Sequence, residues 1–346
     1  MLYGVLFTGG TIVSGSAFGP LDTTQYGQLQ ITAEELIARD PTLFNVSQLA
    51  VSNWTSEAGS TGTSDPLVMN MTRFTHDALC SEDSDIDGAV YTHGTNSLEE
   101  TAFLLDLLVN CESPKPIVGI GAMRPFTALS FDGDANFFQG VALAASPASR
   151  GRGVLVAFSD RILSGFWLTK MVPNFADGFG ATAGGDLGAF INNRPYFFNT
   201  PSTPIQKFEF DLGTVNAHSS FPALPKVDIL YAAREFDGYS ALDAMGRGTE
   251  GVVIAGTGNG GLVNGDDQIE EAFDKGLYVV VGTRSPYGAS TPALFPKLAK
   301  AGYIHVIQAR IMLQLAIASG FSQNRTIELF EGSLREAIGQ PFEYEE

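Results

Sequence analysis

The stretch LYGVLFTGGTI, residues 2–12, joins a short apolar segment directly to a glycine pair and a threonine. Residues 2–7 predict a buried β-strand, and Gly9-Gly10 predict the turn that ends it. In an open α/β sheet, ligands bind beyond the carboxyl ends of the strands, so this turn places hydroxyl groups at a candidate site. On spacing alone, an ordinary strand-to-loop turn also accounts for the stretch. Neither GxGxxG nor GxxxxGK[ST] occurs, so the turn is not a phosphate loop.

Short apolar runs alternate with longer helical segments along the rest of the chain, which predicts an α/β fold with mainly parallel strands. The expected strands are Leu2–Phe7, Gly88–Thr92, Pro116–Ile120, Gly153–Phe158, Val227–Tyr231, Val252–Ala255 and Leu277–Val281. The expected helices are Thr32–Arg39, Leu98–Val109, Asp134–Ala145, Ile269–Lys275, Pro292–Ala299 and Gln308–Ala318, with a capping box from Thr32 to Glu35.

Five prolines between residues 195 and 225 interrupt this alternation and indicate a domain connection. We therefore expect a larger N-terminal α/β domain over residues 1–195, whose mainly parallel sheet is flanked by helices. A linker over 196–225 and a smaller C-terminal α/β domain over 226–346 complete the predicted organisation.

The chain of 346 residues is 44% hydrophobic and carries a formal net charge of -18. Such a negative field repels phosphate backbones and anionic membranes, so neither nucleic acid nor a membrane is an expected partner. No apolar run approaches the roughly 18–20 residues of a membrane span. A small neutral or zwitterionic substrate suits this composition better.

Two cysteines and four N-x-[ST] sequons, at Asn45, Asn53, Asn70 and Asn324, favour an oxidising and glycosylating route. Two buried thiols would also explain the cysteine pair. Residues 1–14 have no basic region or cleavage site typical of a signal peptide, so an exported form is expected to have lost its leader.

A second polar segment, VYTHGTN at residues 90–96, also follows a predicted strand directly. A solitary lysine, Lys170, and a tyrosine, Tyr26, lie in polar surroundings elsewhere; each alone is typical of a surface position. A hydroxyl attacks an amide when a base takes its proton, and a lysine of depressed pKa is such a base. The scattered histidines, the position of the cysteines and the lack of metal-ligand spacing do not favour Ser-His-Asp, cysteine or metal catalysis.

At these residues the chain resembles the bacterial-type L-asparaginase family and is similar to its exported class II enzymes. The resemblance runs along nearly the whole chain. It rests on TGGTI at 8–12, THGTN at 92–96 with LEET at 98–101, GAMRP at 121–125, Lys170 and GNG at 258–260. It implies hydrolysis of L-asparagine to L-aspartate and ammonia through an acyl-threonine intermediate, without metal or cofactor, in a homotetramer with sites between subunits.

The resemblance also implies the role of each catalytic residue. Thr11 is the expected nucleophile, with Tyr26 on a mobile lid over residues 14–30 polarising it. Thr95, Asn96 and Lys170 form the expected second group, in which Thr95 and Lys170 relay protons.

For substrate binding, the resemblance places Ala122 and the backbone near residue 95 at the oxyanion. Ser56 and Glu57 are expected to grip the α-carboxylate and α-amino groups; an alternative register gives this role to Thr63 and Asp65. Asn259 resembles a contact made across a subunit interface. Cys80 and Cys111 match a disulfide of exported members.

Three features depart from the family pattern. Asn96 stands where many members carry aspartate, which is expected to lower the pKa of Lys170 by removing an anion. No Asp or Glu occurs between Asp274 and Glu328, and Phe295 stands where the family supplies a glutamate for the ammonium group. The third departure is a Gly/Ser/Thr-rich insert near 58–65. Two alternatives therefore remain open, an amidase for another amide such as glutamine and a catalytically weak secreted binding protein.

Overall fold

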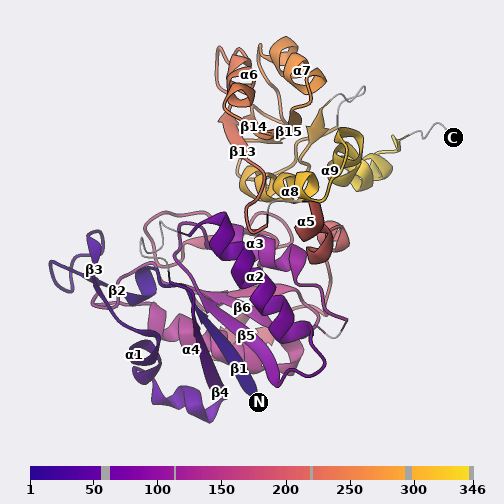
Figure 1. Ribbon diagram of the computed structural model, residues 1–346. Helices are drawn as coiled ribbons and strands as arrows, with labels where there is room; N and C mark the ends of the chain where they lie inside the picture. The colour runs from indigo at the N-terminus through magenta and orange to yellow at the C-terminus, as the bar shows by residue number, and fades with distance from the viewer. Residues whose placement is uncertain (56–62, 113, 219–220, 293–297, 343–346) are drawn as a thin grey trace. The chain divides into compact units, whose positions relative to one another are not determined.

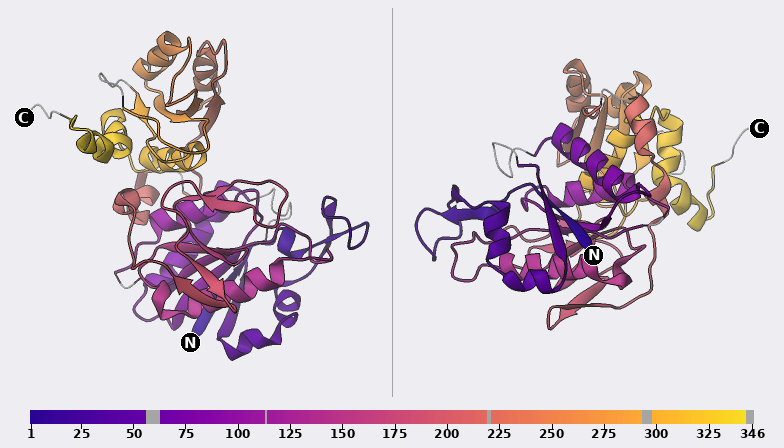
Figure 2. Two further views of the ribbon diagram at one scale, coloured as in Figure 1. Left: turned by 180° about the vertical axis from the view of Figure 1, so that it is seen from behind. Right: turned by 60° about the horizontal axis from the view of Figure 1, so that its bottom comes forward.

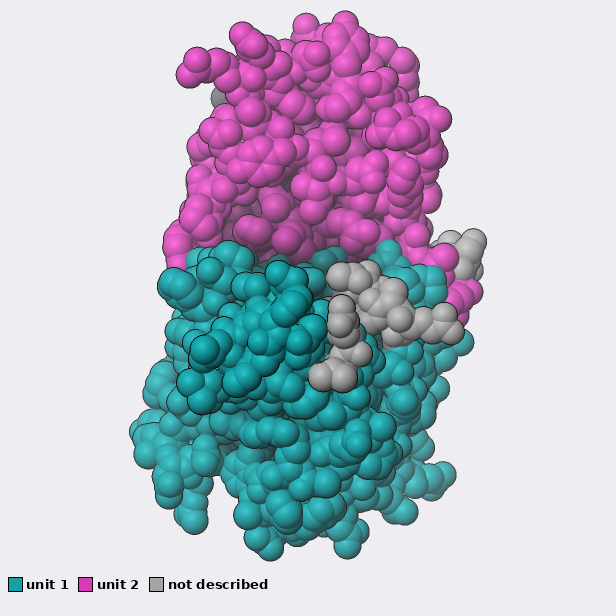
Figure 3. Space-filling model, turned by 90° about the vertical axis from the view of Figure 1, so that its left-hand side faces the viewer, with its two compact units in different colours: residues 1–204 teal, residues 205–346 magenta. Residues whose placement is uncertain are grey.

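The computed structural model describes residues 1–55, 63–112, 114–218, 221–292 and 298–342. The chain divides into two compact units, Met1–Pro204 and Ile205–Glu346, which Figure 3 colours separately. The boundary falls inside the segment 196–225 predicted to connect two domains. That segment also holds two short helices, η5 (Ile205–Phe208) and α5 (Leu212–His218).

The first unit contains one large sheet. Its strands are β1 (Leu2–Phe7), β4 (Gln48–Asn53), β5 (Ile86–Thr92), β6 (Ile117–Ile120), β7 (Val154–Phe158), β8 (Arg161–Ser164), β11 (Gly188–Ile191) and β12 (Arg194–Phe197). They follow the order β12-β11-β8-β7-β6-β5-β1-β4. From β4 to β7 all neighbours are parallel, whereas β8, β11 and β12 add an antiparallel edge.

Helices cover both faces of this sheet (Figures 1 and 2). They are α1 (Ala33–Ala38), α2 (Asp65–Cys80), α3 (Leu98–Leu108) and α4 (Gly133–Ala145), and shorter turns are η1 (Thr11–Val13), η2 (Pro41–Asn45) and η4 (Pro147–Ser149). Because side chains alternate along a strand, Tyr3, Val5 and Phe7 pack in the core with α1 and α4. Leu6 packs in the opposite core with α2 and α3.

Two small antiparallel ladders accompany the large sheet. They pair β2 (Ser14–Ser16) with β3 (Tyr26–Gln30) and β9 (Leu168–Lys170) with β10 (Phe179–Ala181). The first ladder is a hairpin whose base is tied to the segment that follows β6, because Phe126 N–H donates to Ser14 O at 2.9 Å. The two ends of the segment predicted as a lid, residues 14–16 and 26–30, thus pair as a hairpin.

The second unit contains a four-stranded parallel sheet in the order β13-β14-β15-β16. Its elements are β13 (Val227–Tyr231), β14 (Gly251–Gly256), β15 (Tyr278–Thr283), β16 (Ala299–Lys300), α6 (Tyr239–Gly246), α7 (Asp266–Asp274), α8 (Val306–Ala318) and α9 (Gln323–Ala337). The fully buried Glu331 of α9 accepts from Arg335 Nε at 2.6 Å and from Lys300 N at 2.7 Å, so a hydrogen-bonded carboxylate joins α9 to β16.

The predicted α/β fold class is confirmed, and so is the capping box, in which Thr32 and Glu35 exchange hydrogen bonds at 2.8 and 3.2 Å. The predicted helix Pro292–Ala299 is wrong at its end, because Ala299 begins β16; residues 293–297 lie outside the described part. Among the described residues, no helix has the length and apolar character needed to cross a membrane.

Cys80 and Cys111 form a disulfide, as the family resemblance implies. Cys80 is the last residue of α2 and Cys111 follows α3, with 5.0 Å between their Cα atoms. Both cysteines pack against the core that these two helices share with the sheet. The bond therefore ties together the ends of two neighbouring helices.

Replacing both Cys80 and Cys111 by alanine should lower the free energy of unfolding by about 3–4 kcal/mol, because the bond restricts the unfolded chain. The two cysteines are separated by 31 residues in sequence, which sets the size of the closed loop. Denaturant unfolding of the variant beside the wild type measures the difference. An unchanged midpoint and slope would contradict a stabilising role.

Candidate active site

Three loops meet at the carboxyl ends of three adjacent parallel strands. Phe7 at the end of β1 pairs with Thr92 at the end of β5, and Thr92 pairs with Ile120 at the end of β6. The segments that follow are Gly9-Gly10-Thr11, His93–Asn96 and Gly121–Pro125. Three of the sequence motifs therefore lie side by side at one edge of the sheet, where ligands bind in open α/β folds.

The first two loops touch through glycine backbones. Gly10 has a φ of 100°, a left-handed conformation that an L side chain rarely adopts. A Cβ atom on residue 10 would lie 2.6 Å from Gly94 N and 2.7 Å from Gly94 Cα, closer than atoms pack. Glycine at position 10 thus permits the close approach of the Thr11 turn to the Thr95 loop.

Thr11 opens the turn η1 and is only 4% exposed. Its Oγ1 donates to the hydroxyl of Tyr26 over 3.4 Å, longer than an ordinary O–H···O hydrogen bond. Tyr26 begins β3 and is 42% exposed, so it lies between the buried hydroxyl and solvent. The structure thus brings together the residues predicted to be nucleophile and lid tyrosine.

Thr95 and Lys170 form a second hydroxyl–base pair. Lys170, the last residue of β9, is half-buried, and its Nζ donates to Thr95 Oγ1 at 2.9 Å. Thr95 itself is buried. Burial lowers the pKa of Lys170, and the negative charge of Glu99 partly opposes this shift. A lysine with a lowered pKa is closer to the neutral form that accepts a proton.

Glu99 is a residue whose place in the site the sequence did not indicate. It lies in the first turn of α3, is 5% exposed, and its Oε2 accepts from the backbone N–H of Lys170 at 2.9 Å. Burial raises the pKa of Glu99 to about 7, although the hydrogen bond from Lys170 and its charge act in the opposite direction. The only sequence signal was a pair of glutamates in the first turn of an apolar helix, and that pattern does not show which of the two is buried.

His93 holds the loop that carries Thr95. It is fully buried, with Nδ1 2.8 Å from Gly94 O and Nε2 2.9 Å from Thr101 Oγ1. Because a carbonyl can only accept, Nδ1 is the protonated nitrogen and Nε2 accepts from the threonine. Burial lowers the pKa of His93 to about 4, so this histidine is a neutral structural link at physiological pH.

The third loop is fixed by side chains of the following helix. Asp132 accepts from the backbone N–H groups of Met123 and Arg124 at 2.9 and 3.0 Å. Asn136 Nδ2 donates to Gly121 O at 3.0 Å. Ala122, the predicted oxyanion residue, is fully buried between these anchors.

The remaining predicted site residues either lie outside the described part of the chain or take no part in the two hydroxyl contacts described above. Ser56, Glu57 and Phe295 lie outside the described residues. In the alternative register, Thr63 is half-exposed and Asp65 is the first residue of α2. Asn96 is exposed and adjoins Thr95. Asn259 belongs to the second unit, is exposed, and donates from Nδ2 to Thr291 Oγ1 at 3.0 Å.

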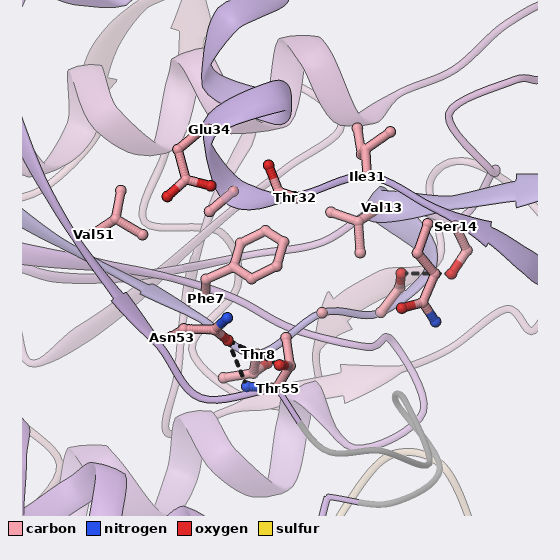
Figure 4. A pocket seen from close by; sticks show the side chains of 14 residues that line it. Phe7, Thr8, Val13, Ser14, Ile31, Thr32, Glu34, Val51, Asn53 and Thr55 are labelled. Atoms are coloured by element: carbon pink, nitrogen blue, oxygen red, sulfur yellow. Dashed lines mark hydrogen bonds between the residues drawn. The ribbon is translucent and has the colours of Figure 1, made fainter.

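A cavity of about 300 Å³ adjoins the Thr11 turn, and Figure 4 shows its side chains. Phe7–Gly10 form one wall, and Thr32, Glu34, Asn53 and Thr55 contribute polar groups from α1 and the end of β4. Thr55 donates from N and Oγ1 to Asn53 Oδ1 at 3.0 and 2.9 Å. Thr11, Thr95 and Lys170 do not line this cavity, so the candidate site is defined by the contacts of these side chains and not by the cavity.

Comparison with known proteins agrees with this geometry. Residues 4–203 match the family described as "Asparaginase, N-terminal", and residues 226–330 match the "Glutaminase/Asparaginase C-terminal domain". L-asparaginase 2-3 of Saccharomyces cerevisiae is 37% identical over 94% of this chain and 88% of its own length. L-asparaginase 2 of Escherichia coli is 32% identical over 94% of this chain and 91% of its own.

One solved structure has a fold similar to that of this chain. It is described as a probable cytoplasmic L-asparaginase from Campylobacter jejuni and superposes with a TM-score of 0.82. The two sequences are 31% identical, and the match covers 95% of this chain and 98% of the other. Fold, motifs and full-length relatives agree, and the chain belongs to the asparaginase family.

Proposed function

We propose that this protein hydrolyses the side-chain amide of L-asparagine to L-aspartate and ammonia, with Thr11 as nucleophile. The observation that carries the proposal is the pair of hydroxyl contacts on two touching loops, Thr11 with Tyr26 and Thr95 with Lys170. Family membership and relatives named L-asparaginase support the same activity. In this reading the acidic chain recognises a small zwitterion rather than a polyanion.

In the first half-reaction, Thr11 Oγ1 attacks the side-chain carbonyl carbon and its proton leaves through Tyr26 and bound water. Backbone N–H groups near Thr95 and at Ala122 stabilise the oxyanion. The C–N bond then breaks, the departing amine takes a proton, and ammonia leaves an aspartyl ester on Thr11. In the second half-reaction water attacks the ester carbonyl and gives a proton to the Thr95–Lys170 pair. As the bond between the carbonyl carbon and Thr11 Oγ1 breaks, the pair returns a proton to Oγ1, which releases aspartate and restores the Thr11 hydroxyl.

Substrate recognition is assigned to residues after β4 and to a neighbouring subunit. Ser56 and Glu57 would hold the α-carboxylate and α-amino groups, and Asn259 would reach the site of another copy. The homotetramer that the family resemblance implies is also part of the proposal. No cofactor and no metal take part in the steps assigned to these side chains.

Export and glycosylation are further parts of the proposal. The disulfide Cys80–Cys111 suits an oxidising compartment. The four sequon asparagines, at positions 45, 53, 70 and 324, are all exposed, as attachment of a glycan requires. The structural relative from Campylobacter jejuni is described as a probable cytoplasmic L-asparaginase.

A second candidate, an amidase for another amide such as glutamine, is favoured by the uncharged Asn96 and the lack of a carboxylate between Asp274 and Glu328. Carboxylates at these two places would bind the α-ammonium group, which asparagine and glutamine share, so their lack favours most an amide that has no free α-amino group. Ammonia release from asparagine, glutamine and a dipeptide amide separates the two activities. Release from none of the three would leave a protein that only binds.

Replacing Thr11 by alanine should reduce kcat for ammonia release by at least about a thousandfold, because it removes the hydroxyl that forms the ester. Thr42→Ala, at an exposed threonine of η2, is the matched control and should keep full activity. Retention of more than about a tenth of the wild-type rate by the Thr11 variant would rule this nucleophile out.

Replacing Asn96 by aspartate should move the activity profile to higher pH. The new anion adjoins Thr95, whose hydroxyl lies 2.9 Å from Lys170 Nζ, and an anion near an ammonium raises its pKa. The neutral amine of Lys170 is the active form, so protonation of Lys170 sets the acidic limb of the profile. A higher pKa therefore moves this limb to higher pH. A profile that stays in place, measured by kcat against pH, would contradict this assignment.

The KM for asparagine should lie above the micromolar range, because fewer carboxylates face the α-ammonium group. Losing one charge-assisted hydrogen bond costs roughly 1.5–3 kcal/mol, or about ten- to a hundredfold in affinity. For the same reason, an asparagine analogue without a charged α-amino group should lose less than about tenfold in kcat/KM. A micromolar KM, or strict rejection of the analogue, would show that another anion binds the ammonium.

A further inference from the structure

The carboxylate of Glu99 lies behind the lysine of the proposed proton relay. It is 5% exposed, and one of its oxygens, Oε2, accepts from the backbone N–H of Lys170 at 2.9 Å. The opposite end of the same lysine, Nζ, donates to Thr95 Oγ1 at 2.9 Å. One carboxylate thus anchors the backbone of the residue whose side chain bonds the second threonine.

The other charged groups near this pair are engaged elsewhere. On α3, the neighbouring Glu100 is half-exposed and influences Glu99 rather than Lys170. In the preceding loop, His93 is buried and hydrogen-bonded at both nitrogens. Tyr26 contacts Thr11 on the first loop.

The strand paired with β9 adds no charge of its own, because β10 consists of Phe179, Gly180 and Ala181. Beyond it, Arg161 donates to Phe179 O at 2.7 Å and is paired with Asp177 and Asp186 at 2.9 and 2.8 Å. Among the described residues, Glu99 is therefore the carboxylate that acts on Lys170.

We propose that Glu99 is the positioning residue and charge partner of the Thr95–Lys170 pair, in a chain where residue 96 is an amide. The inference rests on the proposed function. The hydrogen bond to the Lys170 backbone fixes the point from which the side chain reaches Thr95. The negative charge stabilises the ammonium that forms when Lys170 takes a proton through Thr95.

The sign of the electrostatic effect follows from the opposite charges of the two groups. Burial raises the pKa of Glu99 to about 7 and lowers the pKa of Lys170, and in each case the charge of the other group opposes the shift. Each group therefore stabilises the charged form of the other. Removing the carboxylate lowers the pKa of Lys170 further. The lysine then stays neutral to lower pH but becomes a weaker base, so activity extends to more acidic pH while its maximum falls.

Glu99→Gln keeps the size of the side chain and an oxygen for the Lys170 N–H but removes the charge. We expect the acidic limb of kcat to move down by about one pH unit and the maximum kcat to fall about tenfold. KM should change by less than about twofold, because Glu99 is buried and bonded to the backbone of Lys170. Ammonia release measured from about pH 5 to about pH 9 gives all three quantities.

Two further variants separate charge from structure. Asn96→Asp in the Glu99→Gln background should move the acidic limb back toward the wild-type position, because it returns an anion to the pair from the other side. Glu100→Gln makes the same change of charge one residue along α3. It should leave kcat within about twofold of wild type and the acidic limb at the wild-type pH.

A Glu99→Gln enzyme with the wild-type limb and kcat would overturn the proposal, as would equal effects of Glu99→Gln and Glu100→Gln. Should Glu99→Gln fail to fold, Glu99→Asp gives the test, because it keeps the charge but shortens the reach to Lys170. It should lower kcat without moving the limb, and a moved limb would count against the charge role. Absence of ammonia release by the wild type would refute the proposed function itself, which is a different outcome from an active wild type with an unaffected Glu99→Gln.

Discussion

The close approach of the Gly10 turn to the backbone of Gly94 is the constraint on which the site depends. A Cβ atom on residue 10 would overlap the Gly94 backbone, and the φ of 100° at this position suits glycine. The parallel pairing of β1 with β5 brings the two turns to the same edge of the sheet. Thr11 and Thr95 thereby come from separate loops but belong to one surface.

Burial gives these loops their chemistry. The ionisable groups beneath them, His93, Glu99 and Lys170, are all shifted toward their neutral forms by loss of water. A neutral histidine fixes the loop, and a lysine with a lowered pKa is available as a base. In a surface loop the same glutamate and lysine would be solvated charges, and such a lysine would not accept a proton from a hydroxyl near neutral pH.

The sequence predicted those elements whose signal is local. The strand Leu2–Phe7 was predicted correctly because an apolar run that ends at Gly-Gly is a signal between neighbouring residues. The capping box was predicted correctly for the same reason, since Thr32 pairs with Glu35 only three residues away. The helix α2 was missed because a Gly/Ser/Thr-rich stretch precedes it and its polar and apolar residues are mixed. The predicted helix ending at Ala299 failed because pairing of β15 with β16 decides that residue.

Most of the proposed catalytic residues could be predicted only through the family resemblance, because a lone Lys170 or Tyr26 has no distinctive local pattern. Glu99 shows what such reasoning leaves out. Its sequence neighbourhood, two glutamates at the start of an apolar helix, is typical of a solvated helix terminus with a favourable dipole. Only the tertiary packing of α3 against β9 reveals that one of the two glutamates is buried against Lys170.

The identity of the nucleophile is tested most directly by trapping the acyl-enzyme. Turnover of asparagine is stopped by rapid acid quenching, and the peptides are then analysed by mass. We expect an aspartyl ester on the peptide that contains Thr11, attached to the Thr11 hydroxyl. An ester on Thr95 instead, or continued ammonia release with no ester on either threonine under conditions where deacylation is slowed, would contradict the account.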